Sequence, residues 1–349
     1  MTKPKILIIG CGAVGLSQGY HLSTGADITY LVRPGRKPAF AAPKYLYDYK
    51  ANALRVFENY RLIDSVREVA GEEFYCVFDT LDGHTARSEA GTATLRSVGD
   101  LIRDNLKTFV VYDAIGLGIA DHYATSLGIS PNRLVLAFSM LAHQPTNTIS
   151  IPATANRDLA AKADLFYSHQ PGEVGLLVFN NQPKLLKALK EVYEKNNVLH
   201  VQSLPAFMIE LAPMLAMLQV VTWNIDGYKE FEYLYNNAQL WPLLLEAQKE
   251  ILRLPRFGWT GWVLSWLLGS WATAKMAASP IEGALPLSYH EFNAFHHGGK
   301  VVKQDIRMLE DVVIEGEKAG HKMKSLREIC RLATETENKK AKARASEIK

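Results

Sequence analysis

The feature that most limits the fold of this chain is an apolar run followed at once by a glycine cluster, KILIIGCGAVG. The run at residues 6–9 favours a strand and is too short for the apolar part of a cleaved targeting peptide. Gly10, Gly12 and Gly15 follow in G-x-G-x-x-G order, and a helical pattern begins within them at residues 14–23. A strand, a glycine turn and a helix in this order open a dinucleotide-binding βαβ unit.

Each of these glycines meets a steric demand of such a turn. Gly10 permits the tight turn, Gly12 lets the backbone approach a pyrophosphate, and Gly15 lets the helix pack closely on the strand. The phosphates are expected at the helix N-terminus, where free N–H groups and the helix dipole favour an anion. We therefore expect the cofactor to contact Gly10, Cys11, Gly12, Ala13, Val14 and Gly15.

The end of the second predicted strand, at residues 27–32, distinguishes the two nicotinamide cofactors. NAD binders carry Asp or Glu there for the ribose hydroxyls, whereas this chain has Arg33, with Arg36 and Lys37 behind it. A guanidinium suits a 2′-phosphate and gains nothing from a bare hydroxyl. The pattern favours NADP(H), with Arg33 and Arg36 as contacts. The alternative is that these residues are ordinary solvated loop cations.

Strand and helix patterns alternate through the first third of the chain. Further strands are predicted at 74–79 and 108–113, with a helix at 94–105 between them. The later segments RLVLAFSML and DLFYSHQPGEVGLLVFN suggest extra strands that either finish the sheet or pair antiparallel. Such alternation builds a parallel sheet from βαβ units. From residue 183 the periodicity is helical and includes a buried helix at 205–223.

This change of pattern sets the predicted domains. A Rossmann-type α/β domain is expected at 1–203 and an all-α substrate domain at 204–337, and the length of 349 residues is natural for two domains. The last dozen residues, NKKAKARASEIK at 338–349, are basic and are predicted to form a frayed, solvated tail.

Charge and cysteine usage exclude several classes of protein. A formal net charge of +3 gives no indication of a nucleic-acid partner. The three cysteines, Cys11, Cys76 and Cys330, are too far apart for a zinc motif and odd in number. They therefore indicate a reducing compartment, and we expect a cytoplasmic protein without a disulfide framework.

One uncharged stretch, FGWTGWVLSWLLGSWATA at 257–274, just reaches the length of a membrane span. Trp259, Trp262 and Trp266 fall at i, i+3 and i+7 and so share one helical face. A buried helix is the preferred interpretation, and most of the neighbouring aromatic residues are likewise expected in the core. A wall for a lipophilic substrate or a contact with a membrane surface is the alternative, and a stable span is least favoured.

Four motifs, taken in order, resemble the ketopantoate reductase family. They are IGCGAVG with LVRPGR, VVYDAIGLG, QPGEVGLLVFN, and KVVKQDIRMLEDVVIEGEKAG, and together they cover most of the chain. The resemblance implies a Rossmann domain followed by an all-α substrate domain, and an NADP(H)-dependent reduction.

The catalytic residues of that family do not carry over. The position of its proton-donating Lys is taken by Glu210, that of its strand-end Asn by Asp113, and that of its substrate-binding Ser falls near Val301. The position of a second Lys of the family is taken by Thr80, or by Asp79 if the register is shifted by one residue. We expect Thr80 to contact the cofactor. Carboxylates where a substrate carboxylate should bind argue against ketopantoate itself.

Other groups could replace the missing proton donor. Glu210 lies in an apolar segment that would raise its pKa, although a partly exposed Glu at a helix end is the alternative. The segment SYHEFNAFHHGGK offers His296 and Lys300 as a proton donor or polar anchor, or has only capping and surface roles. It lacks the repeated spacing of a metal site, so no metal is expected. The candidate catalytic residues are Glu210, Asp113, His296 and Lys300.

These observations lead to one preferred function and two alternatives. The first is an NADPH-dependent reductase of a bulky, hydrophobic carbonyl, imine or activated alkene. The second is a non-redox cyclase or pericyclase that uses the hydrophobic cleft of the fold. A non-catalytic NADP sensor is the third. The expected partner is a small hydrophobic substrate, and a homodimer is left open.

Overall fold

The computed structural model describes residues 3–347 and divides into two compact units. The first, the α/β unit, contains the chain up to Ala114, Gly118–Ile209 and Ala284–Leu287. The second, the helical unit, contains Ile115–Leu117, Glu210–Gly283 and the chain from Ser288 onward. The main crossing from one unit to the other thus lies between Ile209 and Glu210, a few residues beyond the predicted boundary at residue 203.

The α/β unit is built on an eight-stranded sheet in the order β12-β11-β8-β7-β6-β1-β2-β5. Its strands are β1 (Lys5–Ile9), β2 (Asp27–Leu31), β5 (Arg61–Ile63), β6 (Cys76–Asp79), β7 (Phe109–Tyr112), β8 (Leu134–Ser139), β11 (Val174–Phe179) and β12 (His200–Leu204). The strands from β5 to β8 pair in parallel, whereas β11 is antiparallel to β8. The order β5-β2-β1-β6-β7-β8 is that of a doubly wound dinucleotide fold, as predicted.

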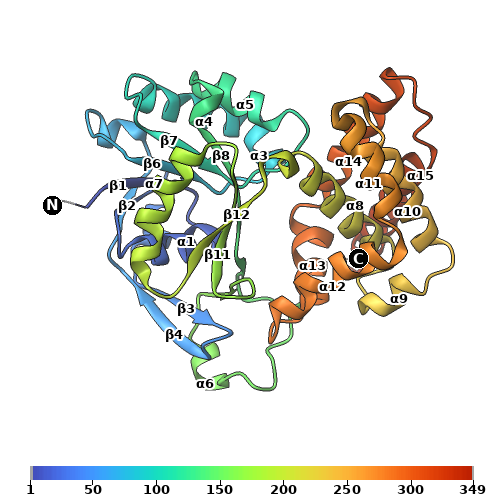
Figure 1. The fold of residues 1–349 in the computed structure, drawn as a ribbon. Coiled ribbons are helices and arrows are strands. Elements are labelled where there is room, and N and C mark those ends of the chain that lie inside the picture. The colour runs from blue at the N-terminus through green and yellow to red at the C-terminus, as the bar shows by residue number, and fades with distance from the viewer. Residues whose placement is uncertain (1–2, 348–349) are drawn as a thin grey trace. The chain divides into compact units, whose positions relative to one another are not determined.

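Helices cover both faces of this sheet (Figure 1). α1 and α7 lie on one face, and α4 and α5 lie on the other. The helices of this unit are α1 (Ala13–Leu22), α2 (Lys37–Phe40), α3 (Gly83–Arg87), α4 (Glu89–Ile102), α5 (Ile119–Leu127), α6 (Arg157–Ala160) and α7 (Pro183–Tyr193). The winding reverses between β1 and β6, which makes their carboxyl ends the expected ligand site.

A second sheet of four strands, in the order β4-β3-β10-β9, was not predicted from the sequence. It contains β3 (Lys44–Asp48), β4 (Ala53–Phe57), β9 (Leu141–His143) and β10 (Leu165–Ser168). Its interior is aromatic, because the ring of His143 stacks on Phe166 at 5.1 Å and on Tyr49 at 5.8 Å. The strand β12 was also missed, since it follows a clear helical pattern.

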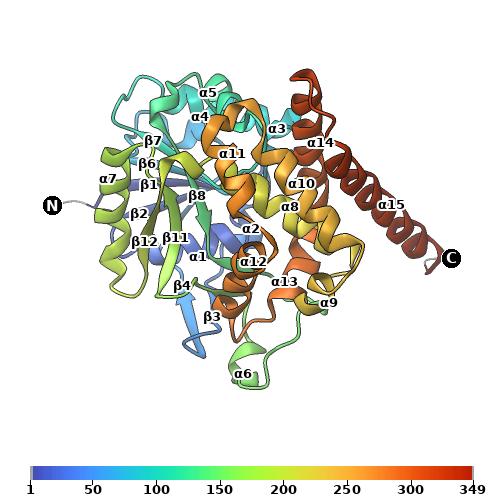
Figure 2. The same cartoon turned by 45° about the vertical axis from the view of Figure 1, so that its right-hand side comes forward.

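The helical unit packs around α8, which is buried along most of its length as predicted. Its helices are α8 (Leu211–Ile225), α9 (Phe231–Tyr235), α10 (Leu240–Leu252), α11 (Gly258–Leu267), α12 (Ser270–Ala284), α13 (Tyr289–Phe295), α14 (Val302–Lys318) and α15 (Lys324–Glu347). α10, α14 and α15 contact α8 (Figure 2). Within the predicted frayed tail, helix α15 continues to Glu347; residues 348–349 lie outside the described part.

The prediction that the tryptophan stripe is buried is wrong. Trp259, Trp262, Trp266 and Trp271 are 78%, 56%, 68% and 73% exposed. Tyr233 and Tyr235 of the aromatic segment are exposed as well, whereas Tyr228 and Trp241 are in the core. Periodicity correctly placed the tryptophans on one face of α11, but small residues occupy the opposite face and pack inward. Within residues 3–347, no helix is both long and apolar enough to cross a membrane.

Candidate functional site

The glycine turn after β1 is closed by contacts that leave no room for side chains at two positions. Gly10 has a φ of +95°, and a Cβ there would lie 2.7 Å from Thr80 Oγ1. A Cβ on Gly15 would lie 2.3 Å from the carbonyl oxygen of Gly10. Both distances are below van der Waals contact, so the turn requires glycine at Gly10 and Gly15.

Gly12 differs from these two glycines, because no atom lies within 4 Å of the position that its Cβ would occupy. It is the N-cap of α1, and no side chain caps this helix end. The ten-residue helix α1 therefore directs its N-terminal N–H groups and its dipole toward open space. This is the arrangement that a pyrophosphate needs, and the residues present fit a dinucleotide.

Thr80 lies beside the turn at the end of β6 and holds it in place. Its hydroxyl donates to the carbonyl of Ile9 over 2.8 Å, and its N–H donates to the same oxygen over 3.2 Å. Cys11 points into the core, where burial raises the pKa of its thiol to about 12. Its thiol is therefore neutral and packs as a small apolar group. The side chain of Ala13 is buried, and that of Val14 is half-buried.

The basic segment after β2 divides into paired and unpaired cations. Lys37 pairs with Glu68 at 2.5 Å and lies 3.7 Å from Asp64. Arg33 and Arg36 are exposed, and neither guanidinium has a hydrogen-bond or ion-pair partner among residues 3–347. Both therefore remain available for an anionic ligand, and Lys37 does not.

Two acidic residues lie at the carboxyl edge of the same sheet, at the ends of β6 and β7. Asp79 is fully buried, accepts the N–H of Leu81 over 2.9 Å and accepts the hydroxyl of Tyr123. Burial raises the pKa of Asp79 to about 7. Asp113 accepts the N–H of Ser139 over 3.3 Å, and burial, with Asp79 nearby, raises its pKa to about 7. Asp113 is thus a carboxyl group that can be protonated near neutrality.

Glu210 directly precedes α8 and does not lie within its apolar part. Its side chain is 57% exposed and forms an ion pair of 3.1 Å with Arg256. Arg256 also binds Glu315 at 2.6 Å. Glu210 therefore corresponds to the alternative stated above, a partly exposed Glu at a helix end.

The histidine segment between α13 and α14 places its members in different surroundings. Burial, with His297 and Lys300 nearby, lowers the pKa of His296 well below its ordinary value, and its ring stacks on Phe292 at 5.5 Å. A neutral imidazole of this kind has no proton to donate as a cation. Lys300 is exposed.

The neighbouring His297, which the sequence analysis did not single out, is the better-supported acid–base group. Its Nδ1 lies 2.7 Å from Oδ2 of Asp305, a carboxylate that is almost fully buried. The amide of Gln304 donates to the other oxygen of Asp305 over 3.2 Å. A carboxylate fixes the tautomer and orientation of such a ring. The spacing of eight residues across a turn gave no helical or strand signal for this pair.

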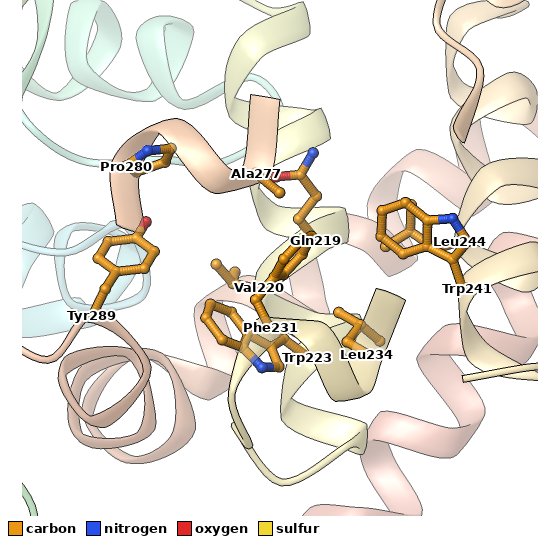
Figure 3. A pocket seen from close by; sticks show the side chains of 10 residues that line it. All are labelled: Gln219, Val220, Trp223, Phe231, Leu234, Trp241, Leu244, Ala277, Pro280 and Tyr289. Carbon is orange, nitrogen blue, oxygen red and sulfur yellow. The ribbon is translucent and has the colours of Figure 1, made fainter. Parts of the chain in front are cut away.

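Aromatic residues of the helical unit enclose a small apolar cavity of about 30 Å³ (Figure 3). Phe231 packs edge-on against Trp223 and Trp241, with ring centroids 5.9 Å apart in both pairs. The side chains around it are Gln219, Val220, Trp223, Phe231, Leu234, Trp241, Leu244, Ala277, Pro280 and Tyr289. A cavity of this volume has room for about two water molecules and is too small for a bulky substrate.

Metal binding was not expected from the sequence. Within the part of the chain that the structure describes, no three His, Cys, Asp or Glu side chains are grouped so that they could hold a metal ion.

The fold and the glycine turn together define the chain as a two-unit protein with a Rossmann-type α/β fold and a separate all-α unit. Among solved structures, it is similar in fold to 2-dehydropantoate 2-reductases, as the motifs predicted. The enzyme from Methylococcus capsulatus matches with a TM-score of 0.65 and 15% identity, over 96% of this chain and 97% of that one. A probable 2-dehydropantoate 2-reductase from Bacillus subtilis matches with a TM-score of 0.65 and 14% identity, over 95% and 99%.

A D-mandelate dehydrogenase, solved with NADH and anilino(oxo)acetate, has the same fold. It matches with a TM-score of 0.64 and 11% identity, over 96% of this chain and 98% of that one. No protein-family model matches the sequence, and a search of curated protein sequences finds no relative. At these identities, the likeness concerns the fold.

Proposed function

We propose that this protein is an NADPH-dependent oxidoreductase that reduces a bulky, hydrophobic carbonyl compound, imine or activated alkene other than ketopantoate. The observation that carries the proposal is the open helix N-terminus at Gly12, at the switch point of the sheet, with two unpaired arginines after the neighbouring strand β2. Similarity in fold to two 2-dehydropantoate 2-reductases and to a dehydrogenase solved with NADH supports the choice of a nicotinamide cofactor.

The preference for NADPH rests on charge. Arg33 and Arg36 have no carboxylate partner among the described residues, and the strand end lacks the acidic residue that binds ribose hydroxyls. A 2′-phosphate would give both guanidinium groups a bidentate partner. Lys37 contributes less, because Glu68 already neutralises it.

The residues of the glycine turn would hold the nicotinamide cofactor, which when bound would supply a hydride to the carbon of the substrate C=O or C=N bond. The heteroatom then needs one proton to complete the alcohol or amine. Asp113 is our candidate donor, because it lies at the carboxyl edge of the sheet and carries a proton up to about neutral pH. Among the residues of the helical unit, His297 is the second candidate, held by Asp305.

A hydrophobic substrate fits the residues better than a small carboxylate anion does. The position that the resemblance gives to a cationic Lys holds Glu210, and Asp113 replaces a neutral Asn. Neither residue would attract a substrate carboxylate, and an ionised Asp113 would repel one. The aromatic content of the helical unit supports an apolar substrate.

Turnover of NADPH tests this proposal. Purified protein with NADPH is incubated with lipophilic ketones, aryl 2-oxo acids, imines and enones, and NADPH absorbance and products are followed together. We expect NADPH consumption matched by reduced product for at least one class. Asp113→Asn should lower the rate by at least about tenfold without changing NADPH affinity, whereas His297→Gln tests the second donor in the same assay.

Two outcomes would contradict the proposal. If NADPH binds but is consumed with none of these substrates, the reductase function is wrong. If a substrate is converted without NADPH consumption, the protein catalyses a non-redox reaction such as a cyclisation.

A further inference from the structure

Helices α11 and α12 expose their tryptophans and turn small residues toward the protein. On α11, Gly261 and Ser265 face the protein, whereas Trp259, Trp262 and Trp266 face outward. On α12, Thr273 and Ala277 are buried, whereas Trp271 and Met276 are exposed. Amphipathic helices of globular proteins normally have the opposite arrangement. We call the outward residues Trp259, Trp262, Trp266, Leu267, Trp271 and Met276 the tryptophan face.

The orientation of these two helices is fixed by contacts on their inner sides. A Cβ on Gly261 would lie 2.1 Å from the carbonyl oxygen of Leu252, so α11 packs against α10 through glycine. The buried amide of Gln248 donates to the carbonyl of Leu268 over 2.8 Å and to the hydroxyl of Thr273 over 2.9 Å. These bonds hold the turn between α11 and α12, and the tryptophans cannot rotate inward without breaking them.

The indole N–H groups also distinguish the tryptophan face from the core. The two buried tryptophans donate to protein atoms, Trp223 to the carbonyl of Lys229 over 2.7 Å and Trp241 to the hydroxyl of Ser270 over 2.9 Å. The indole N–H groups of the four exposed tryptophans donate to no described residue. An indole with an apolar ring and a free N–H suits the boundary between acyl chains and headgroups of a bilayer.

Beside the tryptophan face lie two cations that no carboxylate of the described residues neutralises. Residues 251–281 contain Arg253, Arg256 and Lys275 and no acidic residue. Arg256 is neutralised by Glu210 and Glu315, but Arg253 and Lys275 have no carboxylate partner among residues 3–347. The Arg253 guanidinium lies 5.8 Å from the ring centre of Trp266 and so adjoins the face directly. An apolar surface with cations beside it complements anionic headgroups.

The same charges argue against a second copy of the chain as the occupant. A two-fold symmetric dimer through this face would gather the unpaired cations Arg253 and Lys275 of both copies at one interface. Residues 251–281 offer no acidic residue to compensate this repulsion; Glu282 is the next carboxylate along α12, and Glu210 and Glu315 already pair with Arg256.

We propose that the tryptophan face binds the surface of a bilayer that contains anionic phospholipid. The helices lie in the interface plane, with the indole rings at headgroup level and the free cations against lipid phosphates. This surface is independent of the proposed reductase chemistry, since none of its residues belongs to the glycine turn or the sheet edge.

Vesicle flotation of the full chain tests the proposal. We expect binding to phosphatidylcholine vesicles that contain phosphatidylglycerol, with a blue shift of tryptophan emission and quenching by brominated lipid. The triple variant W259S/W262S/W266S should lose at least about tenfold in partitioning. The variant R253Q/K275Q should lose binding mainly to the anionic vesicles, and added salt should reproduce its effect.

The matched control replaces three exposed apolar residues elsewhere, in L106S/F207S/Y233S, and should bind like the wild type. Circular dichroism verifies that each variant is folded. The proposal is overturned if the wild type does not float, or if the triple tryptophan variant binds as well as the wild type. It is also overturned if the wild type is a dimer without lipid, the tryptophan variant is a monomer, and neither floats, because the face would then join two copies.

Discussion

Asp79 and Asp113 share one sheet edge and one direction of pKa shift, but they differ in their surroundings. Asp79 is sealed in the core by Tyr123 and by the backbone of Leu81. Asp113 is half-buried at the end of β7, where a ligand at the switch point would be expected. We therefore assign a structural role to Asp79 and the chemical role to Asp113.

For Asp113 this assignment predicts the pH dependence of reduction. Its pKa is raised to about 7, so the protonated form that donates is present below that pH and is lost above it. We expect kcat to fall as the pH rises through about 7. In Asp113→Asn the residual rate should lack this inflection, and an unchanged profile in that variant would assign the proton donor to another residue.

For Asp79 the raised pKa predicts a stability effect. Between the ordinary carboxyl pKa and about pH 7, Asp79 binds a proton in the folded state but not in the unfolded state. The free energy of unfolding therefore decreases as the pH rises through this range, up to about 7. Asp79→Asn removes the effect. The free energy of unfolding of the variant relative to wild type should rise by about 1 kcal/mol per unit between pH 5 and 7. Urea denaturation measures the difference.

Comparing wild type with the variant separates the effect of Asp79 from that of groups whose contribution to stability rises with pH. Burial lowers the pKa of His21 to about 3 and that of His143 to about 4, and both residues stabilise the fold as the pH rises. These contributions are common to wild type and variant and cancel in the difference. A relative stability that is flat from pH 5 to 7 would show that Asp79 is ionised in the folded protein.

In the glycine turn and helix α1, one glycine is required for folding and another for the proposed cofactor binding. Gly15 is required for the approach of α1 to the backbone of Gly10, whereas Gly12 has open space in front of it and an extended backbone. Gly15→Ala should destabilise the protein by about 1–3 kcal/mol through overpacking. Gly12→Ala should leave the melting temperature unchanged and weaken NADPH binding by at least about tenfold, because its Cβ enters the phosphate site.

This pair of variants is its own control, since both change a glycine to alanine within one turn. Thermal melts and cofactor titrations on both proteins provide the measurement. Unchanged NADPH affinity in the Gly12 variant would show that the pyrophosphate does not bind at α1.

Local elements could be predicted from the sequence, whereas non-local ones could not. The strand, turn and helix at residues 5–22 are encoded by neighbouring residues, and they fold as expected. Strand β3 pairs with β10, which is more than a hundred residues away in the chain. The sequence near Lys44–Asp48 therefore does not indicate the second sheet. The Asp305 partner of His297 was missed for a similar reason, because a π-helical turn at His296–Lys300 brings the two together.

The exposure of the tryptophan stripe could not be predicted from the sequence for a different reason. Periodicity indicated that three tryptophans share a face, and hydrophobicity then favoured burial of that face. The small residues Gly261 and Ser265 on the opposite side permit a closer approach to α10, and that packing places the tryptophans outside. The identity of the inward face is thus decided by tertiary packing.

At the scale of the whole molecule, the two units have separate hydrophobic cores. We predict two transitions in differential scanning calorimetry. Because the proposed cofactor site lies in the α/β unit, NADPH at a hundred times its Kd should stabilise that unit by about 2.7 kcal/mol. Only one transition should therefore move to higher temperature. A single transition that moves as a whole with NADPH would show that the two units unfold as one.

Isothermal titration calorimetry shows whether the α/β unit binds a dinucleotide that carries a 2′-phosphate. NADPH and NADH are titrated into wild type, Arg33→Ala and a control, Arg157→Ala, which changes an exposed arginine of α6 in the same unit. We predict that wild type binds NADPH more tightly than NADH. Arg33→Ala should weaken the affinity for NADPH by about tenfold to a hundredfold and leave the affinity for NADH unchanged, and the control should behave like wild type. Equal affinity for both cofactors, or for NADPH with and without Arg33, would contradict the account.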